Sequence, residues 1–142
     1  MKKFLPVFLA LLLLLIPLTA LGTTNKNSSS KIVQPLSYQI LAGGTSQLTD
    51  LGNRTVNISG STTTFSLVAQ IGLTLRLQYL SNGSWYTLQT YNYSAYNTSY
   101  VSGGRNLAVS PGYYYRVFAE HTAYKGSIYE TGYSYTEAVY IP

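Results

Sequence analysis

Apolar and polar residues alternate along most of the chain beyond its first 35 positions, with the period of two that is typical of β-strands. In the segment 73–79, leucines and a tyrosine alternate with Thr74, Arg76 and Gln78. A helix would place Arg76 on the apolar stripe beside Leu73, so a strand fits the pattern better. The same reasoning predicts that Val56 and Ile58 share the buried face of an earlier strand.

The alternation predicts an all-β domain with about seven to eight strands and no helix after the first 22 residues. The expected strands cover 46–51, 54–60, 63–71, 73–80, 85–92, 98–109, 113–121 and 128–141, and the last interval holds either one bent strand or two. One face of the third segment is expected to carry Phe65, Leu67, Ala69 and Ile71.

Four dipeptides with turn chemistry separate these segments. Asn82-Gly83 lies between two alternating runs, and it supplies the positive φ values that a two-residue type I′ hairpin needs. Further turns are expected at Gly103-Gly104, Pro111-Gly112 and Lys125-Gly126. Short strands joined by such turns are typical of an antiparallel β-sandwich.

The stretch "VSPGYYYRVFAE" carries the most specific pattern in the chain. It resembles the fibronectin type III pattern, in which an apolar residue, a Pro-Gly turn and a tyrosine lead into the penultimate strand; the matching positions are Val109, Pro111, Gly112 and Tyr115. The resemblance implies an Ig-like or fibronectin type III-like sandwich, with Tyr115 in the core and its hydroxyl bonded to upstream backbone. The pattern covers about the final third of the chain. It departs from the family in the place of its one tryptophan, Trp85, which follows the Asn-Gly turn.

The amino terminus has the three-part pattern of a secretory signal peptide. Lys2 and Lys3 precede a long apolar run, and small residues precede a predicted cleavage site before Thr23. An uncleaved membrane anchor is the alternative, because the apolar run approaches the length of a spanning helix. The sequence therefore predicts a signal peptide at 1–22, a flexible Ser/Asn-rich linker at 23–35 and one sandwich domain at 36–142. The domain is expected to be secreted, either free or associated with the cell wall without a covalent anchor. The overall layout resembles that of small secreted proteins of Gram-positive bacteria, and this resemblance implies no activity.

Composition argues against several classes of function. The chain has no cysteine, so zinc–thiolate sites, thiol nucleophiles and disulfides are excluded. Loss of Lys2 and Lys3 would lower the formal net charge from +5 to +3, and the remaining basic residues are scattered along the sequence. Nucleic-acid binding would need them clustered on one face. We therefore expect no nucleic-acid partner, and contact with a membrane only through the signal peptide.

Catalytic and metal-binding groups are scarce. The carboxylates are Asp50, Glu120, Glu130 and Glu137, and His121 is the one histidine. Glu120 and Glu130 can meet across a terminal hairpin, which keeps a small glycoside hydrolase as a minor hypothesis. Because neighbours on a strand point to opposite faces, Glu120 cannot orient His121, which we interpret as a histidine at a strand end. The sequence thus predicts no catalytic residue, no metal site and no cofactor.

Tyrosine is the residue in excess, with 15 in the chain. Tyrosine rings with Ser, Thr and Asn between them are typical of surfaces that stack on sugars or contact proteins. The candidate contact surface consists of Tyr86, Tyr91, Tyr93, Tyr96, Tyr100, Tyr114 and Arg116. Tyr114 and Arg116 share a face and can stack on each other. The leading hypothesis is a secreted, non-catalytic binding or adhesion module for a cell-surface carbohydrate or protein; the alternative is a self-assembling subunit of an extracellular fibre or layer.

Overall fold

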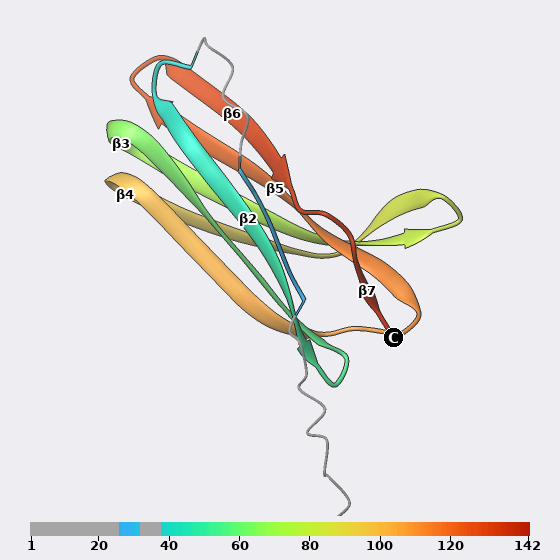
Figure 1. The fold of residues 1–142 in the computed structure, drawn as a ribbon. Coiled ribbons are helices and arrows are strands. Elements are labelled where there is room, and N and C mark those ends of the chain that lie inside the picture. The colour runs from blue at the N-terminus through green and yellow to red at the C-terminus, as the bar shows by residue number, and fades with distance from the viewer. Residues whose placement is uncertain (1–25, 32–37) are drawn as a thin grey trace, which may run out of the picture.

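The computed structural model describes residues 26–31 and 38–142, and the ribbon in Figure 1 shows a curled sheet of seven antiparallel strands. The strands are β1 (Asn27–Lys31), β2 (Leu41–Gly52), β3 (Thr55–Ser81), β4 (Ser84–Ala108), β5 (Tyr113–Lys125), β6 (Ile128–Tyr135) and β7 (Val139–Ile141). The prediction of an all-β, antiparallel fold is confirmed for this part of the chain. No helix long and apolar enough to cross a membrane is present among these residues. The predicted signal peptide lies outside them.

The long strand β3 organises the sheet because its two halves have different neighbours. Residues 55–63 of β3 pair with β2 on one side and with the end of β4 on the other. Residues 70–79 pair with β5 on one side and with the beginning of β4 on the other. The sheet curls between these halves (Figure 1), so that β1, β2 and the adjoining parts of β3 and β4 form a first layer facing a second layer of β5, β6, β7 and the remaining parts.

The core lies between the two layers and includes residues that the alternation predicted, such as Val56 and Ile58. Val56, Ile58 and Leu48 of the first layer are fully buried, and so are Leu75 and Leu77 of the second. Burial of each such side chain contributes about 1.5–3 kcal/mol of transfer free energy. The period-two pattern therefore determines which face of each layer points inward.

The predicted face of the segment 63–71 is wrong in its first part, because the sheet bends there. The β3–β4 register is irregular between Thr63 and Val68, and the buried positions change beyond Val68 from even-numbered residues (Thr62, Thr64, Val68) to odd-numbered ones such as Ile71. Ala69 of the predicted face is exposed as well. Val68 is buried, whereas Phe65 and Leu67 are 64% and 66% exposed. On β4, Asn97 adopts a positive φ of 50° close to the same bend.

The seven strands agree with the predicted number, but the predicted intervals within 54–80 and within 85–109 are joined into β3 and β4, and two glycine positions lie inside these long strands. Gly72 lies inside β3 against the side chain of Thr122, and Gly103-Gly104 lies inside β4 instead of forming a turn. The ring of Tyr93 covers Gly103, and any Cβ at that position would overlap it. These glycines leave room for a neighbouring side chain to lie against the strand backbone, and they do not reverse the chain.

Three of the predicted turns are confirmed. Asn82 and Gly83 connect β3 to β4 with φ values of 49° and 75°, as a two-residue type I′ hairpin requires. Gly112 and Gly126 have positive φ in the turns before β5 and β6. The terminal interval 128–141 holds two strands, β6 and β7.

The strand β5 shows the expected alternation, with Tyr115 in the core. Its hydroxyl donates a hydrogen bond of 2.8 Å to the backbone carbonyl of Ser110, the upstream contact expected for this tyrosine. At the other end of the described chain, residues 27–31 lie within the predicted flexible linker but form β1, which pairs with β2 in continuous register. The three consecutive serines of β1 therefore extend the first layer.

Candidate functional site

The exposed aromatic residues gather on the outer face of the second layer. Alternate residues of β5 point outward, and the register places Phe118 opposite Tyr135 and Glu120 opposite Tyr133 of β6. We define the aromatic face as Trp85, Tyr114, Arg116, Phe118, Tyr133, Tyr135 and Tyr140. Tyr133 and Tyr135 expose 54% and 62% of their surface. Since antiparallel pairing fixes which residues are neighbours, this face follows directly from the strand register.

Arg116 lies between two rings at the centre of this face. Its guanidinium carbon lies 4.2 Å from the ring centroid of Trp85 and 5.7 Å from that of Tyr135. Its Nε donates a hydrogen bond of 2.9 Å to Gln78 Oε1. Burial lowers the pKa of Arg116, and the neighbouring Tyr135 opposes that effect. Arg116 thus fixes the orientation of both rings through cation–π contacts.

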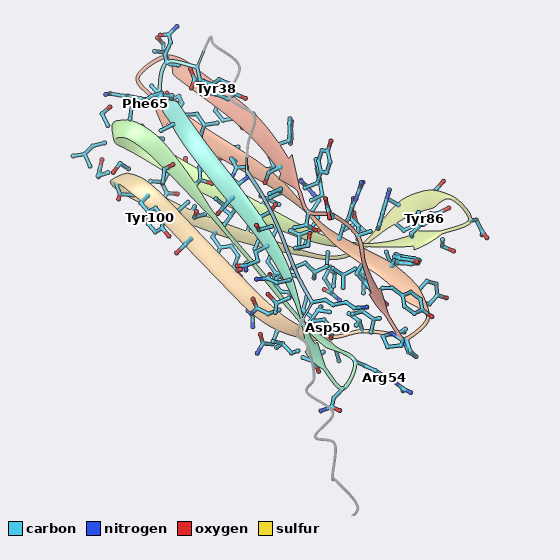
Figure 2. The ribbon with its side chains drawn as sticks, in the orientation of Figure 1. Tyr38, Asp50, Arg54, Phe65, Tyr86 and Tyr100 are labelled. Carbon is cyan, nitrogen blue, oxygen red and sulfur yellow. The ribbon has the colours of Figure 1, made fainter. Side chains whose placement is uncertain are left out.

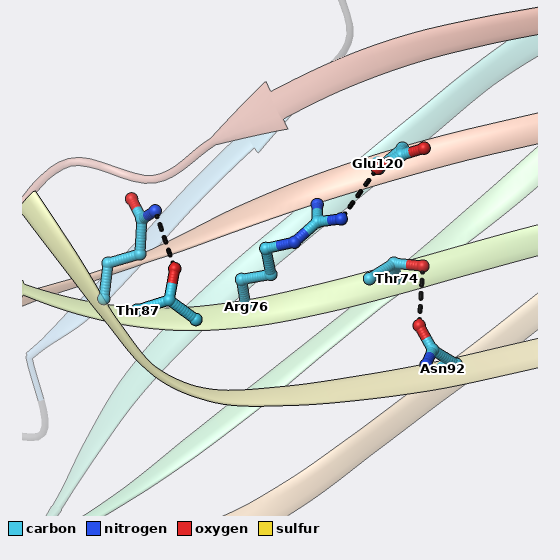
Figure 3. Close-up of polar contacts among 6 residues, drawn as sticks. Thr74, Arg76, Thr87, Asn92 and Glu120 are labelled. Atoms are coloured by element: carbon cyan, nitrogen blue, oxygen red, sulfur yellow. Dashed lines mark hydrogen bonds and ion pairs between the residues drawn. The ribbon is translucent and has the colours of Figure 1, made fainter.

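A second stack lies beside the first. The rings of Phe118 and Tyr133 are parallel within 10°, with centroids 5.6 Å apart, and the guanidinium of Arg76 lies 5.7 Å from the Phe118 centroid. Arg76 also forms an ion pair of 2.9 Å with Glu120, which Figure 3 shows. One basic and one acidic group therefore compensate each other within the ring cluster.

Uncharged polar side chains border the rings on the same sheet. Thr74 Oγ1 donates a hydrogen bond of 2.8 Å to Asn92 Oδ1, and Gln78 Nε2 donates one of 3.3 Å to Thr87 Oγ1 (Figure 3). Amide and hydroxyl groups of this kind retain further donor and acceptor capacity beyond these single bonds. The face thus combines fixed rings with neutral hydrogen-bonding groups.

The predicted tyrosine surface is divided among several places. Tyr91 and Tyr93 point inward and are half-buried against the core, because odd-numbered residues of this part of β4 face the other layer. Tyr86 packs on Tyr79 near the β3–β4 hairpin at Asn82-Gly83, with ring centroids 5.7 Å apart. Tyr96 and Tyr100 are exposed, and Figure 2 shows Tyr86 and Tyr100 far apart.

The remaining two predicted residues, Tyr114 and Arg116, do lie on the aromatic face. They do not stack on each other as expected, because Tyr114 packs on Tyr140 at 5.1 Å and Arg116 stacks on Trp85. Alternation along β5 and β6 would have indicated Phe118 and the β6 tyrosines as members of this face. For Trp85 the sequence held no such signal, because a register shift between Leu77 and Gln78 sets its face.

The interpretation of His121 as a strand-end residue is wrong. It lies within β5 and is fully buried between the layers. Its Nδ1 is 2.9 Å from Thr62 Oγ1, its Nε2 is 2.9 Å from Ser134 Oγ, and Ser134 Oγ donates to Ser46 Oγ at 3.0 Å. Burial lowers the pKa of His121 to about 4, against the opposing effect of a hydrogen bond to the backbone of Ser61. This neutral hydroxyl network connects the two layers.

The two carboxylates of the glycosidase hypothesis do not face one cleft. Glu120 lies on the outer face in its ion pair, whereas Glu130 lies opposite the buried Ala123 on the other face. The Glu130 carboxylate accepts three hydrogen bonds of 2.6–3.0 Å from the backbone N–H groups of residues 39–41. Burial raises the pKa of Glu130, but these three bonds together outweigh it, so the pKa is lowered. Glu130 thus anchors the start of β2 to β6.

The outer face of the first layer is a different kind of surface. It is built of hydroxyl and amide side chains that bond to one another across the strands, such as Thr45 with Ser61 at 2.9 Å and Asn57 with Asn106 at 2.7 Å. A shallow trough crosses it, with Tyr100 at its rim. In the part of the chain that the structure describes, no group of three or more His, Cys, Asp or Glu residues could hold a metal ion.

Comparison with protein-family models, with curated proteins and with solved structures finds no match to this chain. The functional argument therefore depends on the geometry of the aromatic face alone.

Proposed function

We propose that this protein is a secreted binding module whose aromatic face contacts a neutral cell-surface polysaccharide. The observation that carries the proposal is the exposure of Tyr133 and Tyr135 on a face where Phe118 and Arg116 already hold their rings in place. Rings that are fixed before binding lose little conformational freedom on contact, so their apolar faces are available to sugar rings at low entropic cost.

The polar surroundings favour a sugar ligand over an apolar protein partner. Asn92, Thr87 and Gln78 offer neutral donors and acceptors of the kind that sugar hydroxyls need. The charges of Arg76 and Glu120 are paired with each other, and the remaining cation of the face, Arg116, is stacked on Trp85 and bonded to Gln78, so the face carries little uncompensated charge. Export by the predicted signal peptide would bring this face to such a polymer, and this is also part of the proposal.

We also propose that the curled sheet belongs with the Ig-like and fibronectin type III-like sandwiches. The hydrogen bond from Tyr115 to the Ser110 carbonyl supports this grouping, since those domains use the same corner contact. The passage of β3 and β4 from one layer into the other would be this protein's own variation on that architecture.

The test is cosedimentation of the purified protein with insoluble peptidoglycan, chitin and cellulose. Wild type is expected to sediment with at least one polymer, and the double variant Tyr133→Ala/Tyr135→Ala to lose about tenfold or more in affinity, as expected for central aromatic contacts. Tyr96→Ala is the matched control, because Tyr96 is similarly exposed but lies opposite Gln70, at the other end of the β3–β5 pairing from Arg116. If wild type stays in the supernatant with every polymer, or if all three proteins bind equally, the proposal fails.

A further inference from the structure

The strand β4 forms an unusually long free edge of the sheet. It pairs with β3 alone among the described strands, over almost all of its 25 residues, and it forms a margin of the molecule in Figure 1. On such an edge, alternate backbone N–H and C=O groups point outward without a strand to pair with. β4 therefore offers a long template for another strand.

The residues of β4 give this long edge little protection, apart from Arg105, whose guanidinium lies 5.2 Å from the ring centroid of Tyr91. Natural edge strands carry lysine, proline or inward charges, or they are short. β4 contains no proline and no lysine, and its one charged residue is Arg105. By contrast, the other edge strands are short: β1 has 5 residues and includes Lys31, β6 has 8 and includes Glu130, and β7 has 3. Of the edges that the structure describes, β4 is the one suited to pairing.

The core is also incompletely covered along β4. Tyr91, Tyr93, Ala95 and Leu107 pack against the core but remain only partly buried, and all four belong to this strand. A strand added at the β4 edge, with its own apolar residues on the inner face, would cover the rings of Tyr91 and Tyr93. The backbone edge and the uncovered rings are independent observations that indicate the same kind of partner.

We propose that β4 pairs with β4 of a second copy of this chain, antiparallel and centred on the segment 89–95. Residues opposite each other in antiparallel strands share a face, so a two-fold axis would join Tyr91 and Tyr93 of one copy to the same residues of the other. On the outer face the same axis joins Asn92 to its equivalent and Ser94 to Thr90, polar with polar. The shorter edges β1, β6 and β7 cannot match this length.

The symmetric pairing is closed, so it produces a dimer and not a fibre. It also differs from the proposed polysaccharide contact, whose exposed rings Tyr133 and Tyr135 lie on β6, although Asn92 borders both surfaces. The two proposals can therefore fail separately.

The oligomeric state of the purified protein tests the pairing. Wild type is expected to have twice the chain mass in size-exclusion chromatography with light scattering, and Ser94→Lys to shift it to a single chain mass while the far-ultraviolet spectrum stays that of a sheet. Ser127→Lys, in the exposed turn before β6, is the control and should remain dimeric. A monomeric wild type, or a dimer that Ser94→Lys leaves intact, would overturn the proposal.

Cysteine crosslinking tests the register even if the lysine variant fails to fold. Because the chain has no cysteine, Thr90→Cys, Asn92→Cys and Ser94→Cys each introduce a single thiol. At least one of them is expected to form an intermolecular disulfide on mild oxidation, because equivalent residues near a two-fold axis bring their Cβ atoms within reach. Ser127→Cys should not. Failure of all three β4 variants, or equal crosslinking at Ser127→Cys, contradicts the pairing.

Discussion

Acidification from pH 7 to pH 5 should destabilise this protein through His121. The ring is fully buried between the layers, its contacts are the neutral hydroxyls of Thr62 and Ser134, and a side chain at Gly44 would overlap it. Burial holds the pKa of His121 at about 4 in the folded state, whereas the ordinary value of 6.5 applies to the unfolded chain. Between these values the unfolded state binds a proton that the folded state does not.

The sign and size of the effect follow from proton linkage. Stability rises with pH wherever the unfolded state binds more protons, so it is lost as the pH falls through 6.5 and levels off below the folded pKa of about 4. Each full pH unit inside that window corresponds to about 1.4 kcal/mol. Between pH 7 and pH 5, only part of which lies inside the window, the expected loss is about 2 kcal/mol.

Urea unfolding followed by tryptophan fluorescence at pH 7, 6 and 5 measures this loss as a change in the free energy of unfolding. The range stops at pH 5 because Glu130 affects stability only at lower pH. Its pKa is depressed in the folded state, so the stability that it contributes is lost as the pH falls below 5 and through that folded pKa. His121→Gln keeps a polar side chain at the site but removes the titration, so its free energy of unfolding should be lower at pH 7 and flat down to pH 5. A flat wild-type profile, or an equal slope in His121→Gln, would refute the reasoning.

Two further predictions concern stability at neutral pH, each measured by urea unfolding. Tyr115→Phe removes the hydrogen bond to the Ser110 carbonyl while keeping the buried ring, and should cost about 1 kcal/mol; an unchanged free energy of unfolding would mean that the corner contact contributes nothing. Gly103→Val would force the ring of Tyr93 off the strand, and should cost about 1–3 kcal/mol as an overpacked site. An unchanged free energy of unfolding in Gly103→Val would mean that the contact of Tyr93 with Gly103 does not require a glycine.

The features that the sequence predicts well are those that depend on neighbouring residues. Alternation in the segment 73–79 identified the buried leucines. Asn82-Gly83 identified the hairpin between β3 and β4, because two positive φ values in succession suit few other residues. The tyrosine at 115 was placed in the core by a local pattern as well. Each of these signals lies within about ten residues of the feature that it predicts.

The features that sequence reasoning missed depend on residues far apart in the chain. Gly103 resembles a turn residue until the ring of Tyr93 is seen to cover it, and the exposure of Phe65 depends on where the inward positions of β3 change from even-numbered to odd-numbered residues, which is beyond Val68. His121 lies close to Ser134 because β5 pairs with β6, and it meets Thr62 because the sheet curls the first half of β3 over β5. A local pattern cannot predict such contacts, since they depend on which strands pair and which parts of the sheet face each other.

The same distinction explains why the candidate surface moved from β4 to β5 and β6. Counting tyrosines along the sequence favoured 86–100, but alternation turns Tyr91 and Tyr93 inward there, and the bend separates Tyr100 from Tyr86. Outward positions on adjacent strands gather rings more effectively than a dense run on one strand, because half of any such run faces the core. The tyrosines of β4 that face inward instead leave the core margin partly open, which is why the ring-rich strand is better suited to a second copy of the chain than to a sugar.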